Sequence, residues 1–155
     1  MCLFIAKKKA RIASKDITVY KIVKLVPDLE SFKCIEGDFH LKFHMLSEFH
    51  NFEYKLNREY KTKMKLKRIP TCYKYKDRYD FEVNSGFHSW SKPRNELHML
   101  ESEKYKYVLV ECIIPKGSEY YVGKHSLGGS KGRVSNKIII KSILWEITER
   151  SQVIL

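Results

Sequence analysis

The chain has 155 residues and a formal net charge of +12, from 30 Lys and Arg against 18 Asp and Glu. This length suits one domain that buries roughly 70% of its extended-chain surface, so the core needs neither a disulfide nor a metal. The 43% apolar and 13% aromatic content excludes a disordered chain, and no apolar run is long enough to span a membrane.

The amino-terminal residues argue against an export signal. Three lysines at 7–9 follow a short apolar stretch, whereas a signal peptide carries its basic residues first and then a longer apolar region. We therefore expect a cytoplasmic protein. The four cysteines form no CxxC pair, so we expect free thiols and no structural zinc, with Cys112 in the core.

The first elements are a strand and a mixed segment. Residues 16–26 are rich in β-branched side chains and predict a buried strand that ends at Pro27 and Asp28. Residues 28–52 give weak helical or irregular signals. His40 and His44 would share a helix face, but a metal would need a third ligand, and the neighbouring phenylalanines favour plain packing. We predict no metal site.

Basic residues concentrate between Lys55 and Arg78, which hold ten Lys and Arg and two acidic residues. Residues 60–67 alternate strictly and predict a strand with its lysines on one side. Two interpretations stay open. Same-face residues repeat at about 6.6 Å, which suits successive phosphates, or the lysines protect a solvated edge strand. Tyr73, Tyr75 and Tyr79 would supply stacking platforms. The candidate nucleic-acid contacts are Lys61, Lys63, Lys65, Lys67, Arg68 and Lys74.

The second half of the chain predicts more strands and one helix. Residues 86–90 resemble a short strand, and residues 91–103 predict a helix capped by Ser91. Strands are expected at 105–114, 119–122 and 134–147, with a turn at 115–118. The Gly/Lys/Ser segment 124–133 is either an anion cradle or a plain hairpin loop. We predict one α+β domain over 1–155, with a mostly antiparallel or mixed sheet and one or two short helices.

No catalytic constellation is evident from spacing. Ser89 follows His88, but adjacent strand residues point to opposite faces and do not form a dyad by themselves. The chain contains no HExxH or GxSxG motif and no paired carboxylates at helical spacing. Spacing alone therefore supports no reaction class.

Three blocks in this order, 19–21, 86–90 and 108–117, resemble the ADP-ribosyltransferase-like core. The GFHS, CIIPKG and SNKI blocks also resemble a family of small uncharacterised phage and Bacteroidetes-type proteins. Together these resemblances cover 16–23 and 86–141. The first implies that Lys21 holds the phosphate or ribose side of a ligand and that Ser89 braces the nicotinamide-ribose pocket. Where that family has its catalytic glutamate, residues 134–137 contain none, which implies binding rather than turnover unless Glu119 or Glu146 substitutes.

The leading prediction is non-catalytic binding of a phosphate-bearing ligand, an ADP-ribose-type or cyclic nucleotide, with no cofactor. If the protein is phage-encoded, it would act in the bacterial host cytoplasm and sequester an immune signal. The alternatives are a nucleic-acid-binding or structural phage accessory protein with DNA or RNA as partner, and an active ADP-ribosyltransferase. No membrane partner is expected, and a homo-oligomer is left open. The predicted ligand-binding residues are Tyr20, Lys21, Phe87, His88, Ser89, Trp90, Lys124, Lys131 and Arg133.

Overall fold

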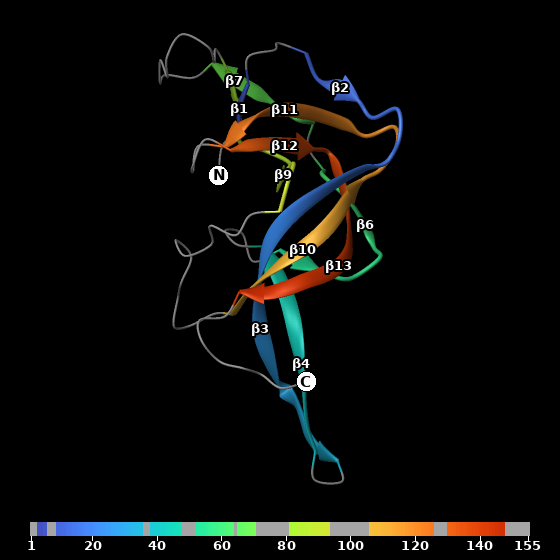
Figure 1. Ribbon diagram of the computed structural model, residues 1–155, viewed down its shortest axis with the longest axis vertical. Coiled ribbons are helices and arrows are strands. Elements are labelled where there is room, and N and C mark those ends of the chain that lie inside the picture. Colours follow the sequence, from blue (N-terminus) through green and yellow to red (C-terminus); the bar gives the residue numbers. More distant parts are fainter. Residues whose placement is uncertain are drawn as a thin grey trace.

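The computed structural model describes residues 3–5, 9–35, 38–47, 52–63, 65–70, 81–93, 106–125 and 130–147. These residues form one curled antiparallel sheet, a half-barrel, and contain no helix (Figure 1). The predicted α+β class, with its transferase-like architecture, is therefore wrong. The strands are β1 Leu3–Ile5, β2 Arg11–Ile12, β3 Ile17–Ile35, β4 Asp38–Ser47, β5 Glu53–Tyr54, β6 Glu59–Lys61, β7 Arg68–Pro70, β8 Phe81–Val83, β9 Phe87–Trp90, β10 Lys106–Ile114, β11 Glu119–His125, β12 Lys131–Ser135 and β13 Lys137–Ile147.

The strand order across the sheet is β6-β13-β10-β3-β9-β12-β11-β1-β8-β7, so β6 and β7 lie at its two ends. Three further pairings lie off this path: β2 pairs with β11, β4 with β3, and β5 with β4. Most neighbours in space are distant in sequence. No helix in the described part of the chain has the length and hydropathy of a membrane span.

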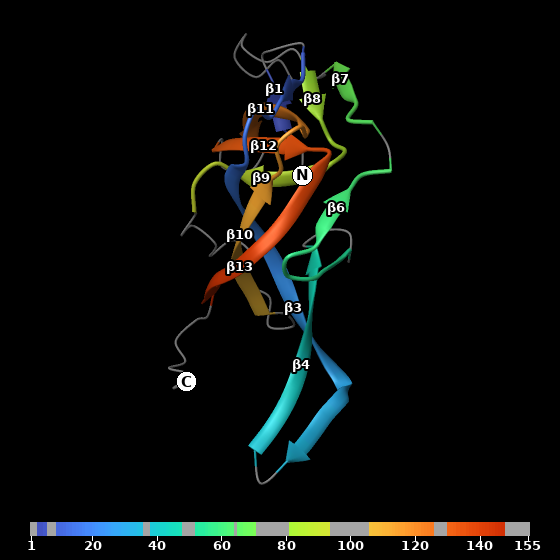
Figure 2. The same ribbon diagram turned by 90° about the vertical axis from the view of Figure 1, so that its right-hand side faces the viewer.

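Strand β3 runs well past the expected stop at Pro27. Its described pairing with β10 ends at Leu25, and β4 pairs along the other edge, with Pro27 opposite Phe43. Proline lacks an N–H, so a strand tolerates it where hydrogen bonds are needed on one edge only. The β3–β4 hairpin projects beyond the rest of the sheet (Figure 2). The segment expected to be helical or irregular is thus partly strand, and strand residues four apart, such as His40 and His44, lie about 13 Å apart.

Other expectations fall on described residues only in part. The predicted helix at 91–103 is described at 91–93 alone, which are not helical, and the remainder lies outside the described residues. The strand expected at 134–147 is divided by Asn136 between β12 and β13. The turn at 115–118 is confirmed: Gly117 has φ +79°, and the Ser118 N–H donates to the Pro115 carbonyl at 3.1 Å.

The sheet packs on both of its faces. Successive residues of β12 alternate between them, and residues paired directly across a ladder share a face. We call the two faces the Val134 face and the Arg133 face. On the Val134 face, one core cluster surrounds Val134 and includes Leu3, Val83 and Tyr121. Where β3 and β10 lie, the Arg133 face carries a second cluster, which includes the fully buried Cys112 as expected.

Candidate functional site

The most basic described segment is residues 61–68, which connect β6 to β7 and which we call the basic strap. Because β6 and β7 lie at opposite ends of the strand order, the strap crosses from one end of the curled sheet to the other (Figure 2). The predicted continuous strand over 60–67 is wrong. Pairing with β13 stops at Lys61 and resumes with β8 at Arg68, while Met64 lies outside the described residues.

The predicted alternation between buried and exposed side chains is seen in this segment, although the segment is not a continuous strand. Leu66 is 4% exposed and packs in the Val134-face cluster, whereas the basic side chains are exposed. Arg68 also lies over the Phe81 ring at 5.2 Å. No residue within the described ranges forms an ion pair with any of the exposed basic side chains of the strap. Lys74 and the tyrosines at 73, 75 and 79 lie outside the described residues. The five exposed cations are Lys61, Lys63, Lys65, Lys67 and Arg68.

The strap is fixed near both ends by hydrogen bonds from its backbone N–H groups. The Thr62 N–H donates to the Asn136 carbonyl at 2.9 Å, and the Lys67 N–H donates to Ser85 Oγ at 3.3 Å. Between them, Leu66 packs against Gly86, which has φ +100°. A Cβ at Gly86 would collide with the Leu66 side chain. The strap is therefore held to the core, with its charges directed to solvent.

The ladder pairing separates the predicted ligand-binding residues onto opposite faces. Trp90 pairs with Gly132 and with Tyr20, and His88 pairs with Val134, which places these side chains on the Val134 face. Ser89 pairs with Arg133, and Lys124 with Lys131. The members on the Arg133 face are Lys21, Phe87, Ser89, Lys124, Lys131 and Arg133. The nine residues therefore do not line one common site.

Three members of that set are engaged inside the protein. The Lys21 ammonium donates to the His88 carbonyl at 3.0 Å and lies 5.8 Å from the centroid of the Tyr54 ring. Ser89 is 1% exposed, and its hydroxyl donates to the Arg133 carbonyl at 3.4 Å. Phe87 is buried in the cluster with Tyr54. The roles that the resemblance implies for Lys21 and Ser89 stay predictions.

The Val134 face holds a buried histidine that sequence reasoning missed. His125 Nε2 lies 2.9 Å from the Ser89 carbonyl oxygen, and its ring lies 5.8 Å from that of His88 and 5.5 Å from that of Trp90. A Cβ at Gly132 would collide with this imidazole. The available signal was strand parity, since residues 121, 123 and 125 share a face.

Burial lowers the pKa of His88 to about 3, and electrostatic interactions with Lys21 and with His125 lower it further. The backbone of Asn84 opposes this shift. His88 is therefore neutral at physiological pH, because its ionised form would lie in the interior. The burial of the Cys112 side chain likewise raises the pKa of its thiol to about 12, so it is not a nucleophile at neutral pH.

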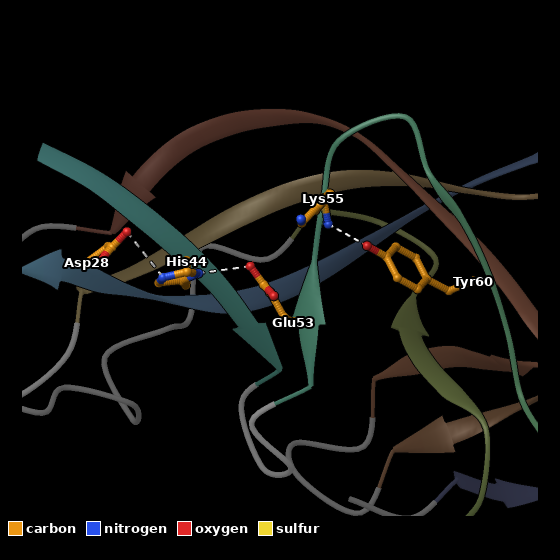
Figure 3. A network of polar contacts seen from close by, with 5 residues as sticks. All are labelled: Asp28, His44, Glu53, Lys55 and Tyr60. Atoms are coloured by element: carbon orange, nitrogen blue, oxygen red, sulfur yellow. Dashed lines mark hydrogen bonds and ion pairs between the residues drawn. The ribbon is translucent and has the colours of Figure 1, made fainter. Parts of the chain in front are cut away.

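A separate polar network ties β3, β4 and β5 together (Figure 3). His44 lies between two carboxylates, with Nδ1 2.8 Å from Glu53 Oε1 and Nε2 3.7 Å from Asp28 Oδ2. The hydrogen bond from His44 lowers the pKa of Glu53 despite an opposing contribution from desolvation. Beside them, the Lys55 N–H donates to the Tyr60 hydroxyl at 2.6 Å. Within the described ranges, no group of three or more His, Cys, Asp and Glu side chains is arranged to hold a metal.

No protein-family model matches the chain, and comparison with curated proteins and with solved structures found no significant match.

Proposed function

We propose that this protein binds nucleic acid through the basic strap. The observation that carries the proposal is the arrangement of five exposed cations on a segment fixed to the core by Leu66 and by hydrogen bonds from two of its backbone N–H groups. A row of Lys and Arg of this kind attracts phosphate backbones, and neutralising phosphates releases counterions from the nucleic acid.

The preorganisation of the strap supports this interpretation over a purely solvating role. A surface that only keeps a protein soluble needs charge, but it does not need its charged segment held in a defined place. Here Gly86, in a backbone conformation that favours glycine, makes room for Leu66 beneath the strap. Because Thr62, Leu66 and Lys67 are already held in place, less conformational entropy is lost when a polyanion binds.

The sheet geometry favours nucleic-acid binding by the strap over nucleotide binding in a single pocket lined by all nine predicted residues. Such a pocket needs its lining side chains on one face. His88 and Trp90 lie on the Val134 face, whereas Lys131 and Arg133 lie on the other. The five cations of the strap, in contrast, lie within eight consecutive residues.

The test is a binding titration with labelled single- and double-stranded oligonucleotides, followed by fluorescence anisotropy at 0.1 M salt. The variant replaces four strap lysines by glutamine: K61Q, K63Q, K65Q and K67Q. If each phosphate contact contributes about fivefold at this salt concentration, the four changes weaken single-strand binding several-hundred-fold. The side chains are exposed, so we expect the fold to be retained.

The matched control removes the same four charges elsewhere, through K9Q, K15Q, K116Q and K141Q. These lysines are exposed and lie outside the strap, and both variants have a formal net charge of +8 instead of +12. We expect the control variant to lose less than about threefold, because distant exposed charges are screened. Equal losses in the two variants, or no binding by the unmodified protein, would refute the proposal.

A further inference from the structure

A second basic surface lies on the Arg133 face of the β11–β12 hairpin. Lys124 pairs directly with Lys131, and Arg133 follows two residues later on the same face. Both lysines are exposed, and neither forms an ion pair with another residue in the described ranges. Opposed like charges destabilise an antiparallel pair. This arrangement is therefore a cost to the fold unless an anion offsets it.

Arg133 extends the same surface toward the interior. One of its terminal nitrogens, Nη1, donates to Ser91 Oγ at 2.9 Å, while its Nε is buried and has no hydrogen-bond partner in the described part of the chain. Burial lowers the pKa of this guanidinium, and Arg11 nearby adds to the effect, while Tyr120 opposes it. Within the described residues, this half-buried guanidinium has an unused donor and no carboxylate partner, so its charge is incompletely compensated.

The backbone around these cations is held firmly. The Ser91 N–H donates to the Lys131 carbonyl at 3.2 Å, and the Ser89 hydroxyl donates to the Arg133 carbonyl. On the opposite face, the His125 imidazole fills the space above Gly132. The three cationic side chains therefore project from paired strands rather than from a loop, and the strand pairing fixes the relative positions of their Cα atoms before any ligand arrives.

We propose that Lys124, Lys131 and Arg133 form a phosphate-binding site, separate from the strap, for the dianionic phosphate of a mononucleotide or for free phosphate. Cross-strand side chains begin about 5 Å apart, and same-face neighbours along a strand about 6.6 Å apart. One phosphate group can therefore accept hydrogen bonds from all three side chains. Arginine suits this chemistry because its planar donors match two phosphate oxygens.

The test measures the binding of AMP, inorganic phosphate and adenosine by isothermal titration calorimetry at low salt. We expect AMP and inorganic phosphate to bind and adenosine not to bind. Tighter binding of AMP than of phosphate identifies a nucleotide ligand, and equal affinities identify the phosphate group alone. Arg133→Gln and Lys131→Gln should each weaken AMP binding at least tenfold, while Lys116→Gln, an exposed control on the 115–118 turn, should leave it unchanged.

A second measurement keeps the proposal testable if Arg133→Gln fails to fold. Lys124→Gln removes the cross-strand repulsion at an exposed position, so without ligand it should melt about 1–2 °C above the unmodified protein. Saturating inorganic phosphate should raise the melting temperature of the unmodified protein, and should raise that of Lys124→Gln less. Undetectable AMP binding, or full binding by Lys131→Gln, would overturn the proposal. The strap variant should bind AMP normally, so failure of one site is distinguishable from failure of the other.

Discussion

Replacing Leu66 by alanine tests whether the basic strap is anchored in the core. The side chain is 4% exposed and packs in the cluster that contains Leu3, Ile5, Val83 and Val134. Removing the equivalent of three methylene groups costs about 2.4 kcal/mol in transfer free energy. A residual cavity adds to this, and buried Leu→Ala changes cost roughly 2–5 kcal/mol in total. We expect about 3 kcal/mol, since an irregular segment can partly collapse onto the space.

The loss is measured as the change in the free energy of unfolding in urea, and by thermal melting. For a chain of this length, about 3 kcal/mol corresponds to a melting temperature roughly 6–12 °C lower. Leu29→Ala is the matched control, because Leu29 is 74% exposed and should lose less than about 0.5 kcal/mol. The folded Leu66→Ala protein should also bind oligonucleotides more weakly, although no charge has changed. A stability loss as small as that of the control would show that Leu66 does not anchor the strap.

Three further predictions concern residues inside the fold: Gly86, His88 and Cys112. Gly86→Ala should destabilise the fold by at least 1 kcal/mol in urea unfolding, because alanine is strained at φ +100° and its Cβ would collide with Leu66. His88 has a folded pKa of about 3, below its unfolded value, so it favours folding fully above about pH 6.5 and progressively less as the pH falls toward 3. The free energy of unfolding of the unmodified protein should fall between pH 6.5 and pH 5, and the fall should be about 2 kcal/mol smaller in His88→Leu, as measured by unfolding titrations at the two pH values. An equal fall in both proteins would contradict the low pKa of His88. Cys112 should resist iodoacetamide in the native state and react after unfolding, as read by peptide mass spectrometry; rapid native labelling of Cys112 would show that its burial is wrong.

The positions of strands could be predicted where β-branched residues are dense, but the residues at which the strands end could not. The sequence predicted a strand at 105–114, and β10 occupies 106–114. Strand β3 was expected to stop at Pro27, yet it continues because its hydrogen bonds there are made with β4. Which edge of a strand is paired depends on tertiary contacts that one sequence does not display. The same limit explains why β4 was not expected within 28–52.

The strap shows which part of a site can be predicted locally. Strict alternation indicated that the lysines face away from Leu66, and the exposure of these residues agrees. A continuous strand was expected, but ladder pairing requires a neighbouring strand, and this segment crosses between two ends of the sheet instead. The β11–β12 surface was harder to predict. The sequence suggested a loop over 124–133, whereas Lys124 and Lys131 are a ladder pair.

The salt dependence of nucleic-acid binding tests the central claim most directly. We would measure the association constant for a single-stranded oligonucleotide between 50 and 200 mM salt, for the unmodified protein, for the strap variant with four Lys→Gln changes and for its matched control. Each phosphate contact adds about −0.7 to the slope of log K against log salt concentration. We predict that the slope for the strap variant is shallower by about 2.8 and that the control retains the original slope. Equal slopes for all three proteins would contradict the assignment of the strap as the nucleic-acid interface.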